Sequence, residues 1–191
     1  MQPELNLSPV ETGQVLLLVD WDNFWYSLFT RFGIGKMNIE DRIRALMGWV
    51  KTIGGLWGGH GFVFAPEHLT SIHREICVNN GLWLVTCPKK QLTEPRRNRK
   101  SGRMETKADT VDETLVNFAK MLTGHPRFKT LCLVSGDNDF VALFQFMHER
   151  GVKTALAAPT VNSLARTQEL IKLVDEYSFK HGKMLLMLDN I

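Results

Sequence analysis

Two runs of apolar, β-prone residues along this chain each end in an acidic cluster. Residues 15–19 lead into Asp20-Trp21-Asp22-Asn23, and residues 131–134 lead into Ser135-Gly136-Asp137-Asn138-Asp139-Phe140. A continuous apolar run of four or five residues fits a parallel strand that is covered on both faces. In open α/β sheets, ligands bind at the carboxyl ends of such strands. We therefore expect the two acidic clusters to meet at one edge of a sheet.

Strand and helix patterns alternate along the rest of the chain. Repeated β-α units predict a mostly parallel sheet with helices on both faces, which is a three-layer α/β/α sandwich. The glycine-rich segment 54–61 does not form GxGxxG, so a dinucleotide fingerprint is not supported. The expected strands are 15–19, 62–65, 82–86, 130–134 and 153–158, and the expected helices are 24–32, 39–53, 69–79, 109–122, 140–150 and 163–177.

The 191 residues suffice for one globular domain with a full core. We place this domain at residues 15–180, between an N-terminal extension, 1–14, and a C-terminal segment, 181–191. The apolar run at 184–188 fits either a last core strand or a partner surface, and we favour the strand.

Net charge is only +3, but it is unevenly distributed. Residues 89–107 hold eight basic and two acidic residues, a local net charge of +6, which leaves −3 for the rest of the chain. Because this segment has almost no apolar residues, we expect a mobile surface loop whose charge suits a polyanion. A solvated charged loop without a partner is the alternative. The basic residues are Lys89, Lys90, Arg96, Arg97, Arg99, Lys100, Arg103 and Lys107.

The basic segment leads into the helix predicted at 109–122, which carries two aspartates near its start. Asp109 is equally suited to cap the helix or to bind a ligand. Asp112 borders the apolar stripe of this helix, where an unpaired carboxylate needs a reason. Four acids at one sheet edge would repel one another unless a cation were bound between them. A hard divalent metal ion with oxygen ligands is the usual cation at such a site.

These motifs together resemble the NYN domain of the PIN-like nuclease superfamily. The resemblance rests on Val19-Asp20-Trp21-Asp22-Asn23, Thr110-Val111-Asp112-Glu113-Thr114-Leu115 and Ser135-Gly136-Asp137-Asn138-Asp139-Phe140, and it extends from about residue 15 to 179. It implies a Mg²⁺- or Mn²⁺-dependent ribonuclease whose acids converge at the C-terminal edge of the sheet. The family usually has one aspartate at the start of the middle helix, where this chain offers Asp109 and Asp112. We favour Asp112 from its Val-Asp-x-x-Leu context.

Phosphodiester hydrolysis needs charge neutralisation at the phosphate and a hydroxide near neutral pH, and bound metal ions supply both. Asp20, Asp112 and Asp137 are the first candidates for metal ligands, with Asp109 and Asp139 binding directly or through water. Asn23 is suited to orient a water or contact a phosphate.

Several neighbouring side chains have a possible role at the same place. Asp22 is expected to cap the following helix, and Ser135 either bonds a carboxylate or substrate or serves as a turn residue. The aromatic residues 21 and 24–26 offer a stacking surface for single-stranded RNA, although helix core is the better interpretation for Phe24 and Trp25.

Two other function classes fit parts of the pattern. A phosphatase of the haloacid-dehalogenase type would use Asp20 as nucleophile and Asp22 as acid/base, but Phe24 departs from its motif and Asp112 would have no role. A non-catalytic RNA-binding module would keep the fold, yet an unused acid cluster costs stability.

The remaining expectations concern location and assembly. Three cysteines without CxxC spacing support neither a disulfide framework nor a zinc site. No signal peptide or membrane span is expected, so we predict a cytoplasmic protein. The oligomeric state, monomer or homodimer, is left open.

Overall fold

The computed structural model describes residues 13–33, 38–97, 102, 104–108, 110–178 and 182–190. Its centre is a six-stranded sheet in the order β10-β7-β6-β1-β2-β3, in which every pair of neighbours runs parallel. The strands are β1 (Val15–Asp20), β2 (Gly61–Pro66), β3 (Leu82–Cys87), β6 (Thr130–Val134), β7 (Lys153–Ala158) and β10 (Leu185–Met187). The predicted mostly parallel sheet is therefore confirmed.

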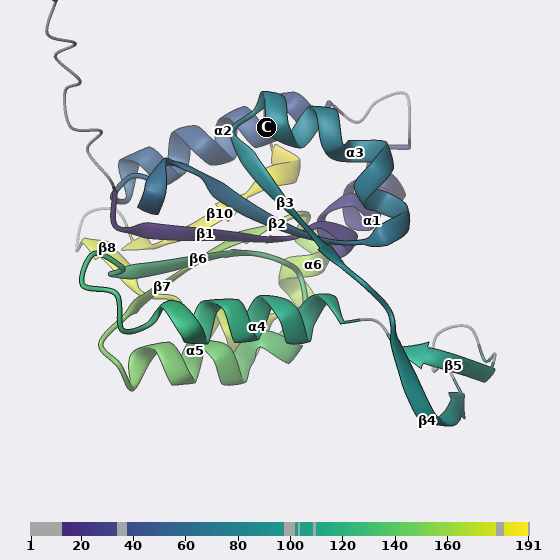
Figure 1. Ribbon diagram of the computed structural model, residues 1–191. Coiled ribbons are helices and arrows are strands. Elements are labelled where there is room, and N and C mark those ends of the chain that lie inside the picture. Colours follow the sequence, from purple (N-terminus) through teal and green to yellow (C-terminus); the bar gives the residue numbers. More distant parts are fainter. Residues whose placement is uncertain are drawn as a thin grey trace, which may run out of the picture.

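Helices cover both faces of this sheet, which makes the predicted three-layer sandwich. Figure 1 shows α2 and α3 over one face and α4 and α5 under the other. The longer helices are α1 (Trp21–Phe32), α2 (Ile39–Thr52), α3 (Glu67–Asn79), α4 (Val111–Leu122) and α5 (Val141–His148). Short helical turns lie at η2 (Trp57–Gly59), η3 (Asn138–Phe140) and η4 (Leu188–Asn190).

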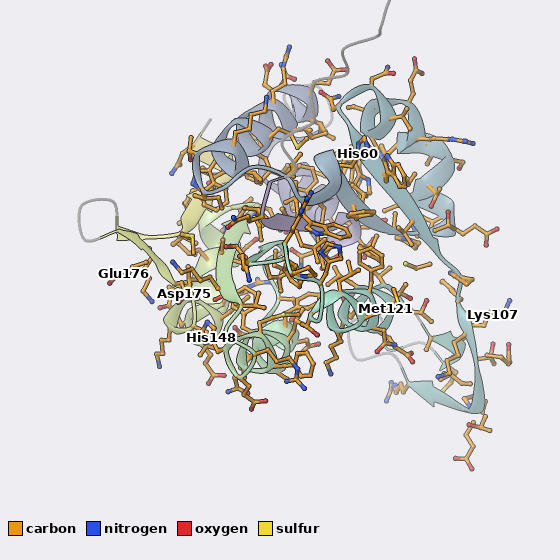
Figure 2. All side chains as sticks on the ribbon, turned by 60° about the vertical axis from the view of Figure 1, so that its left-hand side comes forward. His60, Lys107, Met121, His148, Asp175 and Glu176 are labelled. Carbon is orange, nitrogen blue, oxygen red and sulfur yellow. The ribbon has the colours of Figure 1, made fainter. Side chains whose placement is uncertain are left out.

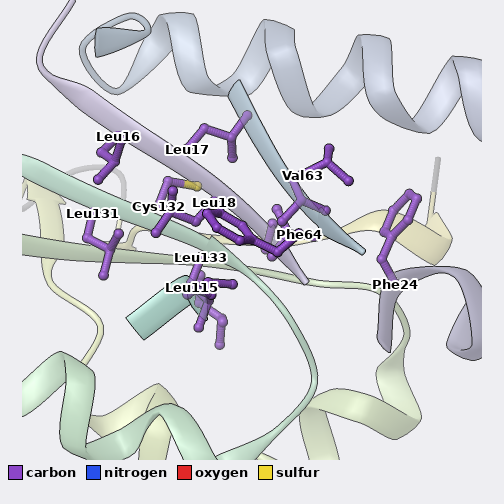
Figure 3. Close-up of a cluster of buried hydrophobic side chains, with 14 of the residues drawn as sticks. Leu16, Leu17, Leu18, Phe24, Val63, Phe64, Leu115, Leu131, Cys132 and Leu133 are labelled. Carbon is purple, nitrogen blue, oxygen red and sulfur yellow. The ribbon is translucent and has the colours of Figure 1, made fainter. Parts of the chain in front are cut away.

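The core is built around β1, all six of whose residues are buried. Figure 3 shows the leucines of β1 packed among side chains from β2, β6 and α4. β1 lies between β2 and β6, and Val19 is the partner of Val134 in the β1–β6 register. The chain leaves β1 on one side toward β2 and β3 and returns on the other side at β6, so the strand order reverses here. Ligand sites of open α/β sheets lie at such a reversal.

The basic segment, which we expected to be a mobile surface loop, contains two strands. β4 (Lys90–Arg97) and β5 (Met104–Ala108) pair antiparallel, with a register shift between Gln91 and Arg96. The Arg97 Nε–H donates to the Gly102 carbonyl at 3.0 Å, which helps to hold the hairpin together. Figures 1 and 2 show this hairpin, which we call the arm, standing apart from the body, with Lys107 on it. The sequence did not indicate these strands, because backbone pairing needs no apolar core.

The final predicted helix, 163–177, is also wrong in its extent. It is divided into α6 (Val161–Arg166) and α7 (Gln168–Lys172), and residues Glu176–Ser178 form β8. The break lies at Thr167, whose buried hydroxyl donates to the carbonyls of Ser163 and Leu164, each at 3.2 Å. Such back-bonding from a threonine side chain bends helices.

The chain after α7 is tied to β7. Asp175 Oδ2 accepts from the backbone N–H of Thr154 at 2.7 Å and lies 2.9 Å from His148 Nε2, and Figure 2 shows His148 and Asp175 side by side. β8 pairs with β9 (Gly182–Lys183), after which β10 joins the sheet beside β7. The apolar run at 184–188 therefore contains the strand that we favoured: β10 is a half-buried edge strand of the sheet, and Met184 and Leu188 on either side of it are buried. Within the described residues, no helix is long and apolar enough to span a membrane.

Candidate active site

Asp20 ends β1 and begins α1. Its Oδ1 accepts from the backbone N–H of Asn23 at 3.2 Å, so Asp20 is the N-cap of α1. The capping role predicted for Asp22 is therefore wrong, because α1 begins at Trp21 and not at the expected residue 24, so Asp22 lies in the first helical turn. Asp20 is only 4% exposed, which places a carboxylate in an almost dry position at the end of the sheet.

The second acidic cluster is bonded directly to the first. Ser135 Oγ–H donates to Asp20 Oδ2 at 3.0 Å, and the same Oγ accepts from the Asp137 N–H at 3.2 Å. Of the two roles considered for Ser135, the bond to a carboxylate is confirmed. Asn23 Oδ1 accepts from the Gly136 N–H at 2.8 Å, so Asn23 holds the acidic loop after β6 against the start of α1. These three bonds fix the position of Asp137 relative to Asp20.

Helix α6 packs closely onto this loop. A Cβ added to Gly136 would lie 2.4 Å from Ser163 Cβ, so only glycine fits there without a shift. Ser163 Oγ lies 2.9 Å from Thr160 Oγ1 and donates to Ser27 Oγ at 3.3 Å, which joins α6 to α1. Asn138 Nδ2 donates to the Arg166 carbonyl at 2.6 Å from the other side of the loop.

The third carboxylate comes from α4. Thr110 is the N-cap residue of this helix, and its hydroxyl donates to the Pro88 carbonyl at 2.7 Å instead of capping the helix. Asp112 follows in the first turn, while Val111 beside it is buried. Asp109, the competing candidate, lies outside the described residues.

Burial raises the pKa of Asp20 from 3.8 to about 7. The negative charge of Asp112 adds to this rise in pKa and that of Asp22 adds less, while the bonds from Asn23 and Ser135 oppose it. Asp112 therefore lies near enough to act on Asp20, although it comes from a different helix. The negative charges of Asp112 and Asp22 lie near the buried carboxylate of Asp20. A bound cation would stabilise the ionised form of this carboxylate.

These residues line one open cleft of about 760 Å³ at the carboxyl ends of β1 and β6. The structure brings together four predicted site residues there: Asp20, Asn23, Asp112 and Asp137. Asp22 lines it too. Asp139 does not: it is exposed in η3, where its N–H donates to Asp137 Oδ1 at 3.1 Å.

The predicted substrate-binding cations lie elsewhere. Lys89, Lys90, Arg97 and Lys107 belong to the arm and the residue before it, and none of these four lines the cleft. Arg99, Lys100 and Arg103 lie outside the described residues, as does the side chain of Arg96.

Of the aromatic residues considered for base stacking, the structure buries two. Trp21 and Phe24 are in the core, where Trp21 Nε1–H donates to His73 Nδ1 at 3.0 Å, so neither can stack on a base. Tyr26 is 47% exposed and lines the cleft.

Sequence reasoning missed much of the cleft wall. The missed residues are polar or basic and come from α1 and from the segment that begins α6: Ser27, Thr30, Arg31, Thr160, Asn162, Ser163 and Arg166. A signal existed in α1, because Asp20, Asn23, Ser27 and Thr30 recur at spacings of three and four and therefore share one helix face. No comparable signal connects α1 with α6, which are distant in the sequence.

The donor set of the cleft fits a hard divalent cation. Its acidic side chains are the four aspartates Asp20, Asp22, Asp112 and Asp137. Mg²⁺ typically binds one or two carboxylates and keeps several water ligands. Within the described part of the chain, no group of three or more His, Cys, Asp or Glu side chains already has the arrangement of a metal site.

Comparisons with known proteins agree with this fold. The family model described as NYN domain matches residues 14–184. A crystal structure of a protein of unknown function, VPA0982 from Vibrio parahaemolyticus, is similar with a TM-score of 0.62 and 15% identity, covering 96% of this chain and 98% of that chain. The search of curated proteins found no match. The family match spans nearly the whole chain, and the protein therefore belongs to the NYN domain family, a PIN-like nuclease family.

Proposed function

We propose that this protein is a metal-dependent ribonuclease that hydrolyses phosphodiester bonds of single-stranded RNA. One observation carries the proposal: Asp20, Asp112 and Asp137, from three separate elements, line one cleft at the carboxyl edge of the sheet. Membership of a nuclease family supports the reaction class.

Asp20, Asp112 and Asp137 would hold one or two Mg²⁺ or Mn²⁺ ions. The buried Asp20 is the anchor, since its two oxygens are oriented by Asn23 and Ser135. Asp109 and Asp139 are further candidates, Asp139 through water because it is exposed and outside the cleft wall. When bound, such an ion supplies positive charge at the scissile phosphate and activates the attacking water.

The chain's own residues have two further tasks in this proposal. Asn23 and Ser135 fix the carboxylates before substrate arrives, which spares the reaction the cost of ordering them. Asp22, at the cleft but less strongly coupled to Asp20 than Asp112 is, adds negative potential that favours cation entry.

RNA would approach from the arm. Lys89, Lys90, Arg97 and Lys107 would contact the phosphate backbone without reading sequence, and Arg96, Arg99, Lys100 and Arg103 from the same segment would add to this charge. Because β5 ends only three residues before α4 begins, the arm leads directly to Asp112. Tyr26, exposed in the cleft, offers a base-stacking surface that single-stranded RNA can use.

The test is cleavage of a labelled single-stranded RNA with Mn²⁺, with Mg²⁺ or with EDTA, by the parent and by Asp137→Asn. Asp41→Asn is the matched control, because Asp41 is an exposed aspartate on α2 outside the cleft. We expect metal-dependent cleavage that Asp137→Asn abolishes and Asp41→Asn retains. Cleavage that survives EDTA or the Asp137→Asn substitution would refute the proposal.

The two alternatives have less support. The family match favours a nuclease over a phosphatase of the haloacid-dehalogenase type. Asp20 and Asp112 repel each other, which costs stability. In a binding module without catalysis, these two acids would have no function that explains this cost. Mn²⁺ binding that depends on these carboxylates separates the module from the nuclease.

A further inference from the structure

The cleft continues beyond the acidic cluster, along a wall formed by two helix faces. On α1, Asn23, Ser27 and Thr30 follow Asp20 on one face, and Arg31 ends this row. Eleven residues separate Asp20 from Arg31, which is about 16 Å along the helix axis at 1.5 Å per residue. The wall therefore extends well past the site of metal binding.

The facing wall has the same character. Thr160, Asn162 and Ser163 begin it, and Arg166, the last residue of α6, ends it. The hydrogen bond between Ser163 Oγ and Ser27 Oγ, 3.3 Å long, holds the two walls together at their base. Each row thus holds hydroxyl and amide groups and an arginine, and Arg31 lies at the far end of α1, whereas the backbone of Arg166 lies at the acidic loop, where its carbonyl accepts from Asn138 Nδ2.

The two arginines are available for a ligand. Arg31 and Arg166 are exposed, and no ion pair joins either of them to a carboxylate among the described residues. This matters because the same cleft holds Asp20, Asp22, Asp112 and Asp137. Guanidinium groups that stand in an acidic cleft without pairing to its acids can bind an external anion.

We propose that Arg31 and Arg166 provide a second phosphate-binding site on the cleft wall, in which Arg31 holds the RNA backbone several nucleotides from the bond that is cleaved and Arg166 contacts it nearer the acidic loop. This inference rests on the proposed ribonuclease function. A guanidinium matches the oxygens of a phosphate through paired N–H donors. At a stacked spacing of about 3.4 Å per nucleotide, a wall of about 16 Å spans up to about five nucleotides.

The two arginines also reduce the electrostatic repulsion between the cleft and RNA. Four carboxylates repel a polyanion, so the acidic centre alone would disfavour RNA before metal is bound. The two arginines on the cleft wall offset this repulsion and direct the strand along the wall. The hydroxyl and amide groups between them can bond the backbone without selecting a sequence.

The test measures binding of a labelled twelve-residue oligouridine in EDTA at several KCl concentrations, so that cleavage does not interfere. The variant is Arg31→Gln with Arg166→Gln. The control is Arg74→Gln with Arg150→Gln, two exposed arginines that do not line the cleft. Thermal unfolding of both double variants confirms that they are folded.

Each lost phosphate contact lowers the slope of log K against log salt by about 0.7 for a single strand. We expect the cleft variant to lower it by about 1.4, with binding weakened about 10- to 30-fold at 0.1 M KCl, and the control variant to match the parent. A cleft variant with the parent's affinity and slope would overturn the second site while leaving metal-dependent cleavage intact. A parent that neither binds nor cleaves RNA would overturn the proposed function, and this inference with it.

Discussion

The hydroxyl of Ser135 donates to Oδ2 of Asp20 at 3.0 Å, which joins the ends of two neighbouring strands inside the protein. The same oxygen accepts from the N–H of Asp137, so one buried serine positions two acids of the proposed centre. The relationship follows from the register: Val19 and Val134 are partners, so the residues that follow them must meet.

Ser135→Ala should destabilise the protein by about 1–3 kcal/mol, because it removes the hydroxyl that bonds Oδ2 of Asp20 and the Asp137 N–H. Urea unfolding measures this change. Ser71→Ala, at an exposed position of α3, is the control and should change stability by less than about 0.5 kcal/mol. Equal stability of the two variants would show that the Ser135 bonds are not important.

The raised pKa of Asp20 predicts an unusual dependence of stability on pH. The folded protein keeps a proton on Asp20 up to about pH 7, whereas the unfolded chain loses it near 3.8. Between these values the folded state binds more protons than the unfolded chain. The contribution of Asp20 to the free energy of unfolding therefore falls as pH rises and is lowest above pH 7. Urea unfolding in EDTA from pH 4 to pH 8 should show this fall.

Asp20→Asn should flatten that profile, because the titrating group is removed. Asn can still accept one bond, and the hydroxyl of Ser135 can turn to accept the other. We therefore expect the variant to gain stability relative to the parent above pH 7. A profile with the parent's slope would show that Asp20 titrates at an ordinary pKa.

Gly136→Ala tests how closely α6 packs on the acidic loop. A Cβ at this position would lie 2.4 Å from Ser163 Cβ and 3.2 Å from Asn23 Oδ1, so the loop or α6 must move. We expect a loss of about 1–3 kcal/mol in unfolding free energy, together with a lower cleavage rate. Gly124→Ala is the control, because no atom lies within 4 Å of a Cβ added there.

The arm makes a prediction about RNA binding that is tested separately from that of the cleft arginines. Lys89→Gln with Lys107→Gln should weaken binding about equally for all RNA sequences and lower the salt slope by about 1.4. Lys51→Gln with Lys172→Gln, at exposed positions outside the arm, is the matched control. An arm variant that binds like this control would remove the arm from the proposed RNA path.

Much of the scaffold was predictable because buried parallel strands have a simple pattern. Strands 130–134 and 153–158 were predicted to the residue, since continuous apolar runs bounded by polar residues have few alternatives. The arm was not, because its pairing buries no apolar face. The break at Thr167 was missed because it depends on where one side chain places its hydroxyl.

The site was predictable where its residues end or follow strands, and at Asp112, which borders the apolar stripe of α4. Asp20 and Asp137 follow β1 and β6, so alignment of the two strands brings them together. Arg31 and Arg166 lie at the ends of helices that are far apart in the sequence, and their shared cleft depends on how α6 packs on α1. No pattern in either helix alone contains that information.

The most direct test of the central claim asks whether Asp20, Asp112 and Asp137 act as one metal-dependent centre. Single-turnover cleavage of a labelled single-stranded RNA in Mn²⁺ would be measured for the three Asp→Asn variants and for the triple variant. Residues that act as a unit are not additive, so each single variant should lose at least about a hundredfold in rate and the triple variant little more. Single losses that are small, or that multiply in the triple variant, would contradict a shared centre.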